Sequence, residues 1–217
     1  MGEAEIKPAS QQLCIYSTLF FYGDAANDAL SLAIVKDIAE HWNEAGGKVR
    51  IKNAVYNVVF NIEGIWAKSL TPEMIFENTS RRNNYFRVEA FASGNISFVD
   101  GVGCNTGYFL LDNLLNNSTT AAHEYGHTIG LDHPDILDIR GKGTPGIMYP
   151  RGTIVDPQFQ YSPVAAPLAP GGTLNPFTRK VLQEDIDNLQ LQRLAYNRSG
   201  IAMIGNFSNI WHQQHER

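Results

Sequence analysis

Several features that define other classes of protein are scarce in this chain of 217 residues. It has only two cysteines, Cys14 and Cys104, which are too few for a disulfide framework and leave open whether the two pair with each other. No apolar run reaches the roughly 18 residues that a membrane-spanning helix requires. The 19 glycines and 10 prolines are close to average usage, which excludes collagen-like and low-complexity chains. We therefore expect a soluble globular protein with no membrane span.

Basic charge is also in short supply, with 17 Lys and Arg residues against 22 Asp and Glu residues and a net charge of −5. Because nucleic-acid-binding domains usually concentrate basic residues on one face, we expect no nucleic-acid partner. The first twelve residues lack the apolar stretch of a secretory signal, so the localisation stays open between the cytoplasm and export by another route. The length suits one domain, residues 1–217, which we expect to act as a monomer.

The first half of the chain alternates between predicted strands and helices. Five segments have the composition or the alternation of β-strands: 13–22, 48–66, 85–92, 95–99 and 107–113. A helix is predicted after the first strand, on apolar residues that recur at a spacing of four, Leu30, Ile34, Ile38 and Trp42. Asp24 is expected to cap this helix and Gly46-Gly47 to end it. A second long helix is predicted over residues 119–129, with Asn117 or Ser118 as its cap.

The composition of the chain becomes loop-like at about residue 141. Seven prolines fall between residues 141 and 176, too many for regular secondary structure, so this segment is predicted to be a loop. Asn175 followed by Pro176 predicts the start of a final helix. His212 and His215 are expected to lie in a mobile tail.

Together these elements predict an α+β fold, with two lobes in the single domain. The α/β-like N-terminal lobe, about residues 1–132, would hold a twisted, mixed five-stranded sheet and two long helices. The C-terminal lobe, about residues 133–217, would be rich in loops and end in a helix.

The residues that carry chemistry lie in one short window. His123 and His127 are four residues apart on a predicted helix, so both imidazoles leave the same face and can reach one Zn²⁺. Gly130 can adopt the left-handed conformation that ends the helix and turns the chain back, which brings His133 to the same metal. Three histidines leave one tetrahedral position open for water, as in catalytic zinc sites. Glu124 lies about 100° further round the helix, where it can reach that water as a general base.

The sequence HEYGHTIGLDH at 123–133 matches the HExxHxxGxxH signature of the metzincin zinc endopeptidases, so the chain resembles this family. Metzincins carry a methionine in a tight turn beneath the metal, and GIMYP at 146–150 resembles this Met-turn, with Met148 as the methionine. The sequence MYP at 148–150 is similar to that of matrixins, whereas Pro134, directly after the third histidine, is similar to serralysins. The sequence QEDI at 183–186 resembles the acidic stretch with which matrixins brace the Met-turn.

The resemblance implies a zinc endopeptidase that hydrolyses peptide bonds of protein substrates, and it favours a secreted, extracellular location. One catalytic Zn²⁺ would be held by His123, His127 and His133, and Glu124 would be the general base. Met148 would shape the floor of the site without taking part in the chemistry.

The resemblance also suggests where a peptide would bind. Residues 95–99 are the candidate edge strand beside the metal, to which a peptide would add as an antiparallel strand, with Ile96 and Phe98 as contacts. The loop after Met148 would wall the pocket for the residue that follows the scissile bond, and its apolar residues suggest a hydrophobic preference. Tyr149 is a further candidate contact. Serralysins and astacins place a tyrosine ligand two residues after the methionine, but this chain has Pro150 there, which favours a structural role for Tyr149.

Two other functions stay open at this point. A non-protease zinc amidase similar to deformylases would use Cys104 in place of His133 as the third metal ligand. An inactive, zinc-stabilised binding module would hold the metal and cleave no protein.

Overall fold

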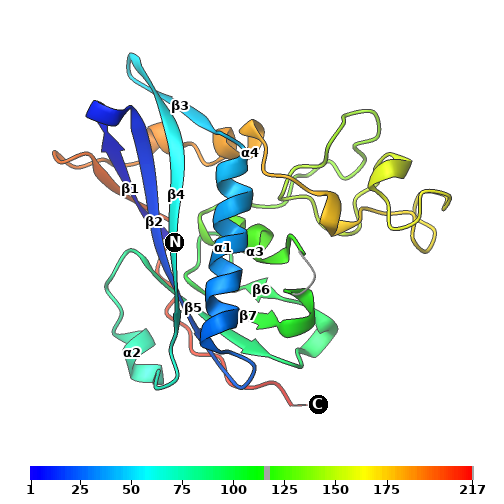
Figure 1. Ribbon diagram of the computed structural model, residues 1–217, viewed down its shortest axis with the longest axis horizontal. Helices are drawn as coiled ribbons and strands as arrows, with labels where there is room; N and C mark the ends of the chain where they lie inside the picture. The colour runs from blue at the N-terminus through cyan, green and yellow to red at the C-terminus, as the bar shows by residue number, and fades with distance from the viewer. Residues whose placement is uncertain (115–117, 217) are drawn as a thin grey trace.

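The computed structural model describes residues 1–114 and 118–216 and is built on a mixed β-sheet (Figure 1). Within these residues the sheet has eight strands in the order β3-β4-β2-β5-β7-β6, with β1 paired to β2 and β8 paired to β1. The strands are β1 (Gly2–Lys7), β2 (Gln12–Tyr22), β3 (Lys48–Ile51), β4 (Ala54–Trp66), β5 (Asn83–Glu89), β6 (Phe98–Val99), β7 (Thr106–Leu110) and β8 (Ile201–Ile204). The helices are α1 (Asp28–Glu44), α2 (Pro72–Phe76), α3 (Thr120–Thr128) and α4 (Gln183–Asn188).

Strand β2 is the centre of the sheet. It pairs in parallel with β4 along most of its length and with β5 at its C-terminal end, and β5 in turn pairs in parallel with β7. Strands β3, β6, β1 and β8 add antiparallel neighbours, so the sheet is mixed as expected. The apolar run of β2 supplies buried side chains such as Leu19 and Phe21 to the main core.

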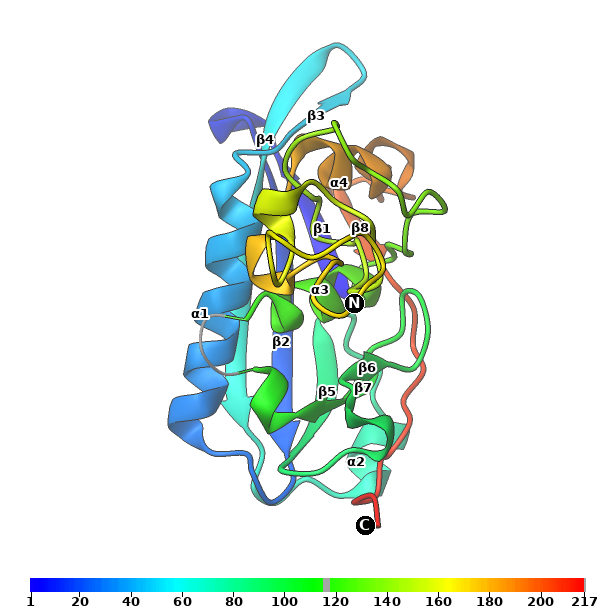
Figure 2. The same cartoon turned by 90° about the vertical axis from the view of Figure 1, so that its right-hand side faces the viewer.

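Helix α1 lies along one face of the sheet, and α3 packs beside it (Figures 1 and 2). The predicted stripe is correct at Ile34, Ile38 and Trp42, which are buried. The predicted cap is wrong, because the Asn27 side chain, and not that of Asp24, accepts the hydrogen bond from the backbone N–H of Leu30, at 2.9 Å. Asparagine is as good a cap as aspartate, so composition alone could not separate the two positions.

The expected number of five strands is wrong for two reasons, and one further strand is shorter than expected. The segment 48–66 forms two strands, β3 and β4, because the chain turns at Lys52, whose φ is 53°. Strands β1 and β8 were not expected, and they pair with each other although they lie near opposite ends of the sequence. The predicted strand 95–99 is confined to Phe98–Val99, since residues 93–95 form a 3-10 turn.

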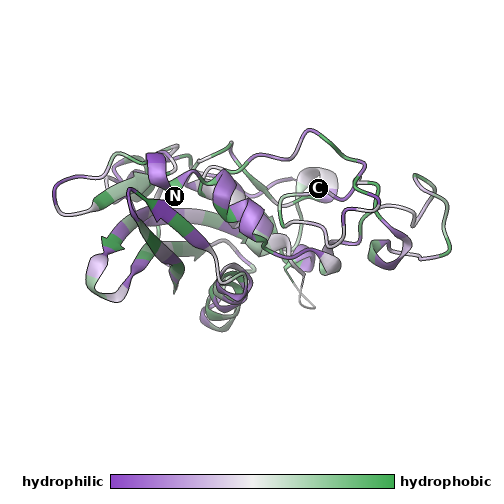
Figure 3. Cartoon of the chain, turned by 90° about the horizontal axis from the view of Figure 1, so that it is seen from above, coloured by the Kyte–Doolittle hydropathy of each residue, from purple (hydrophilic) through white to green (hydrophobic). Residues whose placement is uncertain are grey.

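The C-terminal segment also departs from expectation. Asn175 does cap a turn, since its side chain accepts from the backbone N–H of Phe177 at 3.1 Å, but that turn is a single 3-10 turn and α4 begins only at Gln183. The chain does not end in a helix, because β8 and an extended tail follow α4. The loops between α3 and α4 extend to one side of the sheet (Figure 3).

The tail that carries the last two histidines, expected to be mobile, packs against the sheet. His212 Nε2 lies 2.9 Å from the carboxylate of Asp100, and the ring of His215 stacks on Tyr108 with centroids 4.1 Å apart. Among the described helices, none has the length and apolar character needed to cross a membrane.

Candidate metal centre

Helix α3 is held in place from its buried side. The indole N–H of Trp42, on α1, donates to the carbonyl of Ala122 at 3.0 Å. The hydroxyl of Tyr125 hydrogen-bonds the Ser17 hydroxyl of β2 at 2.9 Å, and its ring meets Trp42 edge-on. These contacts orient the helix so that its remaining face can present side chains to a cleft. Ser118 accepts from the backbone N–H at the helix start, whereas Asn117, the other predicted cap, lies outside the described residues.

Gly130 ends the helix as predicted, with a φ of 104°. Its N–H donates to the carbonyl of His127, and the N–H of Leu131 donates to the carbonyl of Gly126, both at 3.0 Å. This pair of bonds is the Schellman pattern, which satisfies the last helical carbonyls and reverses the chain. The reversal carries His133 back toward the helix.

The structure brings His123, His127 and His133 together. The Nε2 atom of His133 lies 3.1 Å from the Nε2 atoms of both other histidines. Nitrogen ligands at about 2.05 Å from a tetrahedral zinc ion stand about 3.3 Å apart, so the spacing fits one ion. Among the described residues, these three form the one group of metal-binding side chains found.

In each of the two helical histidines, the hydrogen bond made by Nδ1 determines whether Nε2 is free to bind a metal. His123 Nδ1 lies 2.8 Å from the carbonyl oxygen of Ile147, and His127 Nδ1 lies 2.8 Å from that of Leu131. A carbonyl only accepts, so Nδ1 of His127 carries the proton and its Nε2 keeps its lone pair for a metal. His123 Nδ1 lies between this kind of acceptor and the donating guanidinium of Arg179. Burial lowers the pKa of each of the three histidines, most strongly that of His123. The neutral imidazole, which is the form that binds a metal, is therefore favoured.

Glu124 lies between the two histidines of the helix in sequence and lines the same cleft as His123 and His133. Its side chain is only 7% exposed. Burial raises the pKa of Glu124 to about 8, against a smaller opposing effect from Arg179. A carboxyl group with a pKa near neutrality can both accept and release a proton, as a general acid–base group must.

Met148 lies directly beneath the helix. A Cβ atom added to Gly126 would stand 2.3 Å from the Met148 sulfur, so only glycine leaves room for the thioether at this point. Met148 is 3% exposed and belongs to the main core together with Trp42 and Tyr125. Its side chain therefore supports α3 from below, one residue before His127.

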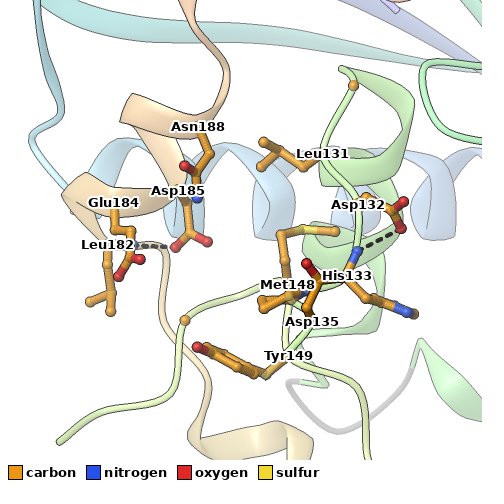
Figure 4. Close-up of a pocket in the computed structure, with 13 residues that line it drawn as sticks. Leu131, Asp132, His133, Asp135, Met148, Tyr149, Leu182, Glu184, Asp185 and Asn188 are labelled. Carbon is orange, nitrogen blue, oxygen red and sulfur yellow. Dashed lines mark hydrogen bonds between the residues drawn. The ribbon is translucent and has the colours of Figure 1, made fainter. Parts of the chain in front are cut away.

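Asp185, on α4, connects this turn to the C-terminal segment. Its carboxylate accepts from the backbone N–H of Leu182 at 2.7 Å and from that of Ile147 at 3.4 Å. Figure 4 shows Asp185, Met148 and His133 among the residues that line one cavity. The hydrogen bond from the backbone N–H of Ile147, the residue before Met148, to the Asp185 carboxylate fixes the turn around Met148 relative to α4.

Arg179 is a residue of the cleft that sequence reasoning missed. Its guanidinium is buried beside the first histidine, with Nε donating to the hydroxyl of Thr119 at 2.9 Å and Nη1 donating to the carbonyl of Tyr149 at 3.0 Å. Nη1 also lies 3.0 Å from His123 Nδ1. The arginine lies 56 residues from that histidine, near the start of the predicted final helix, where a single basic residue forms no pattern that pointed to the site.

The three predicted substrate contacts lie in different places. Ile96 is 55% exposed and lines the cleft with Glu124. The Phe98 ring stacks on Tyr108, and it is not among the residues that line the cleft. Tyr149 packs against the apolar cluster of the C-terminal loops and also lines the cavity that holds Met148 and His133.

The alternative third ligand, Cys104, is not part of the histidine group. It forms an isolated bridge with Asn206, and both cysteines of the chain carry free thiols.

The fold and the site thus define a mixed α/β protein with a candidate three-histidine metal centre. No protein-family model matches the chain, and no curated protein sequence matches it. Among solved structures it is similar to myroilysin, with a TM-score of 0.32 and 14% sequence identity over 66% of this chain. The chain spans 60% of the length of the myroilysin chain. A likeness this low carries no functional argument, so function must be argued from the site itself.

Proposed function

We propose that the chain is a zinc-dependent endopeptidase of metzincin type, which hydrolyses peptide bonds in protein substrates. The observation that carries the proposal is the convergence of three Nε2 atoms within reach of one ion, with Glu124 on the same cleft. His123, His127 and His133 would hold the ion, and the turn around Met148 would serve as the Met-turn. Bound there, Zn²⁺ would supply Lewis acidity, which activates water and polarises a peptide carbonyl.

The protein's own residues supply the rest of the reaction. Glu124 takes a proton from the attacking water and delivers it to the leaving amine, a role that its place on the cleft beside His123 and His133 allows. Strand β6 ends the strand order of the sheet and contacts α3, so an extended peptide can pair with it alongside Glu124. The amidase alternative is not supported, because His133 and not Cys104 completes the group.

The test is cleavage of a peptide library by the zinc-loaded protein, with and without a chelator. We expect hydrolysis that the chelator abolishes and added zinc restores. Glu124→Gln should retain zinc and lose turnover by about 10²–10⁴-fold, the range that a general base contributes. Glu40→Gln, which removes an exposed carboxylate from α1, is the matched control and should remain active. Absence of any cleavage by the zinc-loaded protein would favour the binding module.

A further inference from the structure

The cleft beside the histidines contains a buried positive charge. Arg179 is 4% exposed, and its Nη2 atom has no hydrogen-bond partner among the described residues, whereas Nε and Nη1 are both engaged. The side chain lines the cavity shared by Glu124, His123 and His133. One end of the guanidinium is therefore held by the protein, and the other is available to the cavity.

No carboxylate of the described residues lies within 4 Å of this guanidinium. Burying a cation without a counter-charge is unfavourable, and proteins usually place a carboxylate against it. A guanidinium stays protonated in proteins, so this group carries its positive charge at neutral pH. Glu124 acts on this guanidinium only from a longer range, and an anion supplied by a ligand would provide the direct counter-charge.

A second arginine strengthens the positive character of the same cavity. Arg151 is exposed at its rim, where its Nη2 lies 3.4 Å from the side-chain oxygen of Asn113. Glu124 is the one acidic residue among those that line the cavity. Two guanidinium groups thus face a single carboxylate, in a chain whose net charge is −5.

The position of the cavity identifies which part of a peptide enters it. Glu124 must lie within hydrogen-bond reach of the leaving amine to give it a proton. That amine belongs to the residue that follows the scissile bond. The side chain of this residue therefore occupies the cavity that Glu124 lines.

We propose that this cavity binds a carboxylate on the residue that follows the scissile bond, with Arg179 as its specificity-determining partner and Arg151 at the rim. The inference rests on the proposed endopeptidase function and replaces the hydrophobic preference expected from the sequence. The carboxylate can come from an Asp or Glu side chain within a longer peptide, or from the free C-terminus of a peptide that ends at this residue.

The experiment compares peptides that differ only at this residue, Glu against the isosteric neutral Gln, by the ratio of their kcat/KM values. We expect the zinc-loaded protein to prefer Glu by about ten- to a hundredfold, as hydrogen bonds to charged groups allow. Arg179→Met should bring the ratio close to one and keep its zinc. Arg193→Gln, an exposed arginine on the turn after α4, is the control and should keep the ratio.

Further arms separate the sources of the carboxylate and keep the proposal testable. A peptide that ends at this residue is assayed as free acid and as amide, and preference for the acid without a Glu preference assigns the site to a C-terminal carboxylate. If Arg179→Met fails to fold, Arg151→Gln should still reduce the ratio at low salt, where an exposed charge is least screened.

Two outcomes would overturn the proposal. One is a wild-type ratio of one or less in both the Glu–Gln and the acid–amide comparison. The other is a lower kcat for Arg179→Met on both peptides with the ratio unchanged, which would make Arg179 only a positioning residue. If the zinc-loaded protein cleaves nothing, calorimetric binding of paired Glu and Gln peptide hydroxamates decides the matter. Tighter binding of the Glu hydroxamate would support the carboxylate-binding cavity although the endopeptidase proposal had failed. Equal binding of the two hydroxamates would reject both the cavity proposal and the endopeptidase proposal.

Discussion

Asp185 offers a quantitative test of how the turn beneath the histidines is supported. The side chain is 7% exposed and accepts hydrogen bonds from the backbone N–H groups of Leu182 and Ile147. Burial outweighs these bonds and raises the pKa of Asp185 from its ordinary 3.8 to about 6. The folded protein therefore holds this proton more tightly than the unfolded chain does.

The sign and size of the effect follow from linkage. Between pH 3.8 and about 6 the folded state keeps the Asp185 proton and the unfolded state releases it, so the free energy of unfolding falls as the pH rises through this window. One pKa unit corresponds to about 1.4 kcal/mol, so the loss reaches at most about 3 kcal/mol above pH 6. Asp185→Asn removes the titration and leaves an acceptor oxygen for the two N–H groups.

The assay is urea unfolding of the metal-free protein and the variant, measured in parallel from pH 4 to 8. All other groups titrate in both proteins, so their contributions cancel in the difference. We expect the stability of Asp185→Asn relative to wild type to increase by up to about 3 kcal/mol between pH 4 and pH 7. Asp187→Asn, an exposed acid on the same helix, is the control and should show no such increase. A constant difference for Asp185→Asn would refute the reasoning.

Two further predictions concern the elements that shape the metal centre. Gly130→Ala should lower stability by about 1–2 kcal/mol and Tm by about 2–8 °C, because alanine resists the positive φ although nothing lies within 4 Å of the added methyl group. Gly152→Ala, at an equally open site without a positive φ, should leave Tm unchanged in the same thermal scan, and equal effects would contradict the conformational argument. Met148→Ala should cost about 2–5 kcal/mol in urea unfolding and Met148→Leu less than about 1.5, and a stable Met148→Ala would show that the residue does not support α3.

The histidine group could be predicted because its geometry is local. A spacing of four on a helix determines how His123 and His127 face, and one glycine turn determines where His133 arrives. The same holds for the buried stripe of α1, whose period is visible in the sequence. These features depend on backbone geometry within a dozen residues.

The parts that escaped prediction depend on contacts between distant segments. Strand β8 forms because β1 offers it an edge, and neither strand has a pattern of its own. The tail is ordered because His212 meets Asp100 and His215 meets Tyr108, more than a hundred residues away. Arg179 belongs to the same class, since its burial beside His123 is settled by the path of an irregular loop.

The central claim is that three imidazoles share one metal ion, and metal analysis tests it most directly. The protein is incubated with zinc and dialysed against metal-free buffer, and zinc is then quantified per chain for the wild type, His133→Ala and His41→Ala, which removes a histidine of α1 outside the group. We predict about one zinc ion per chain for the wild type and for His41→Ala, and almost none for His133→Ala. A wild-type protein that retains no zinc, or a His133→Ala variant that retains it fully, would contradict the account.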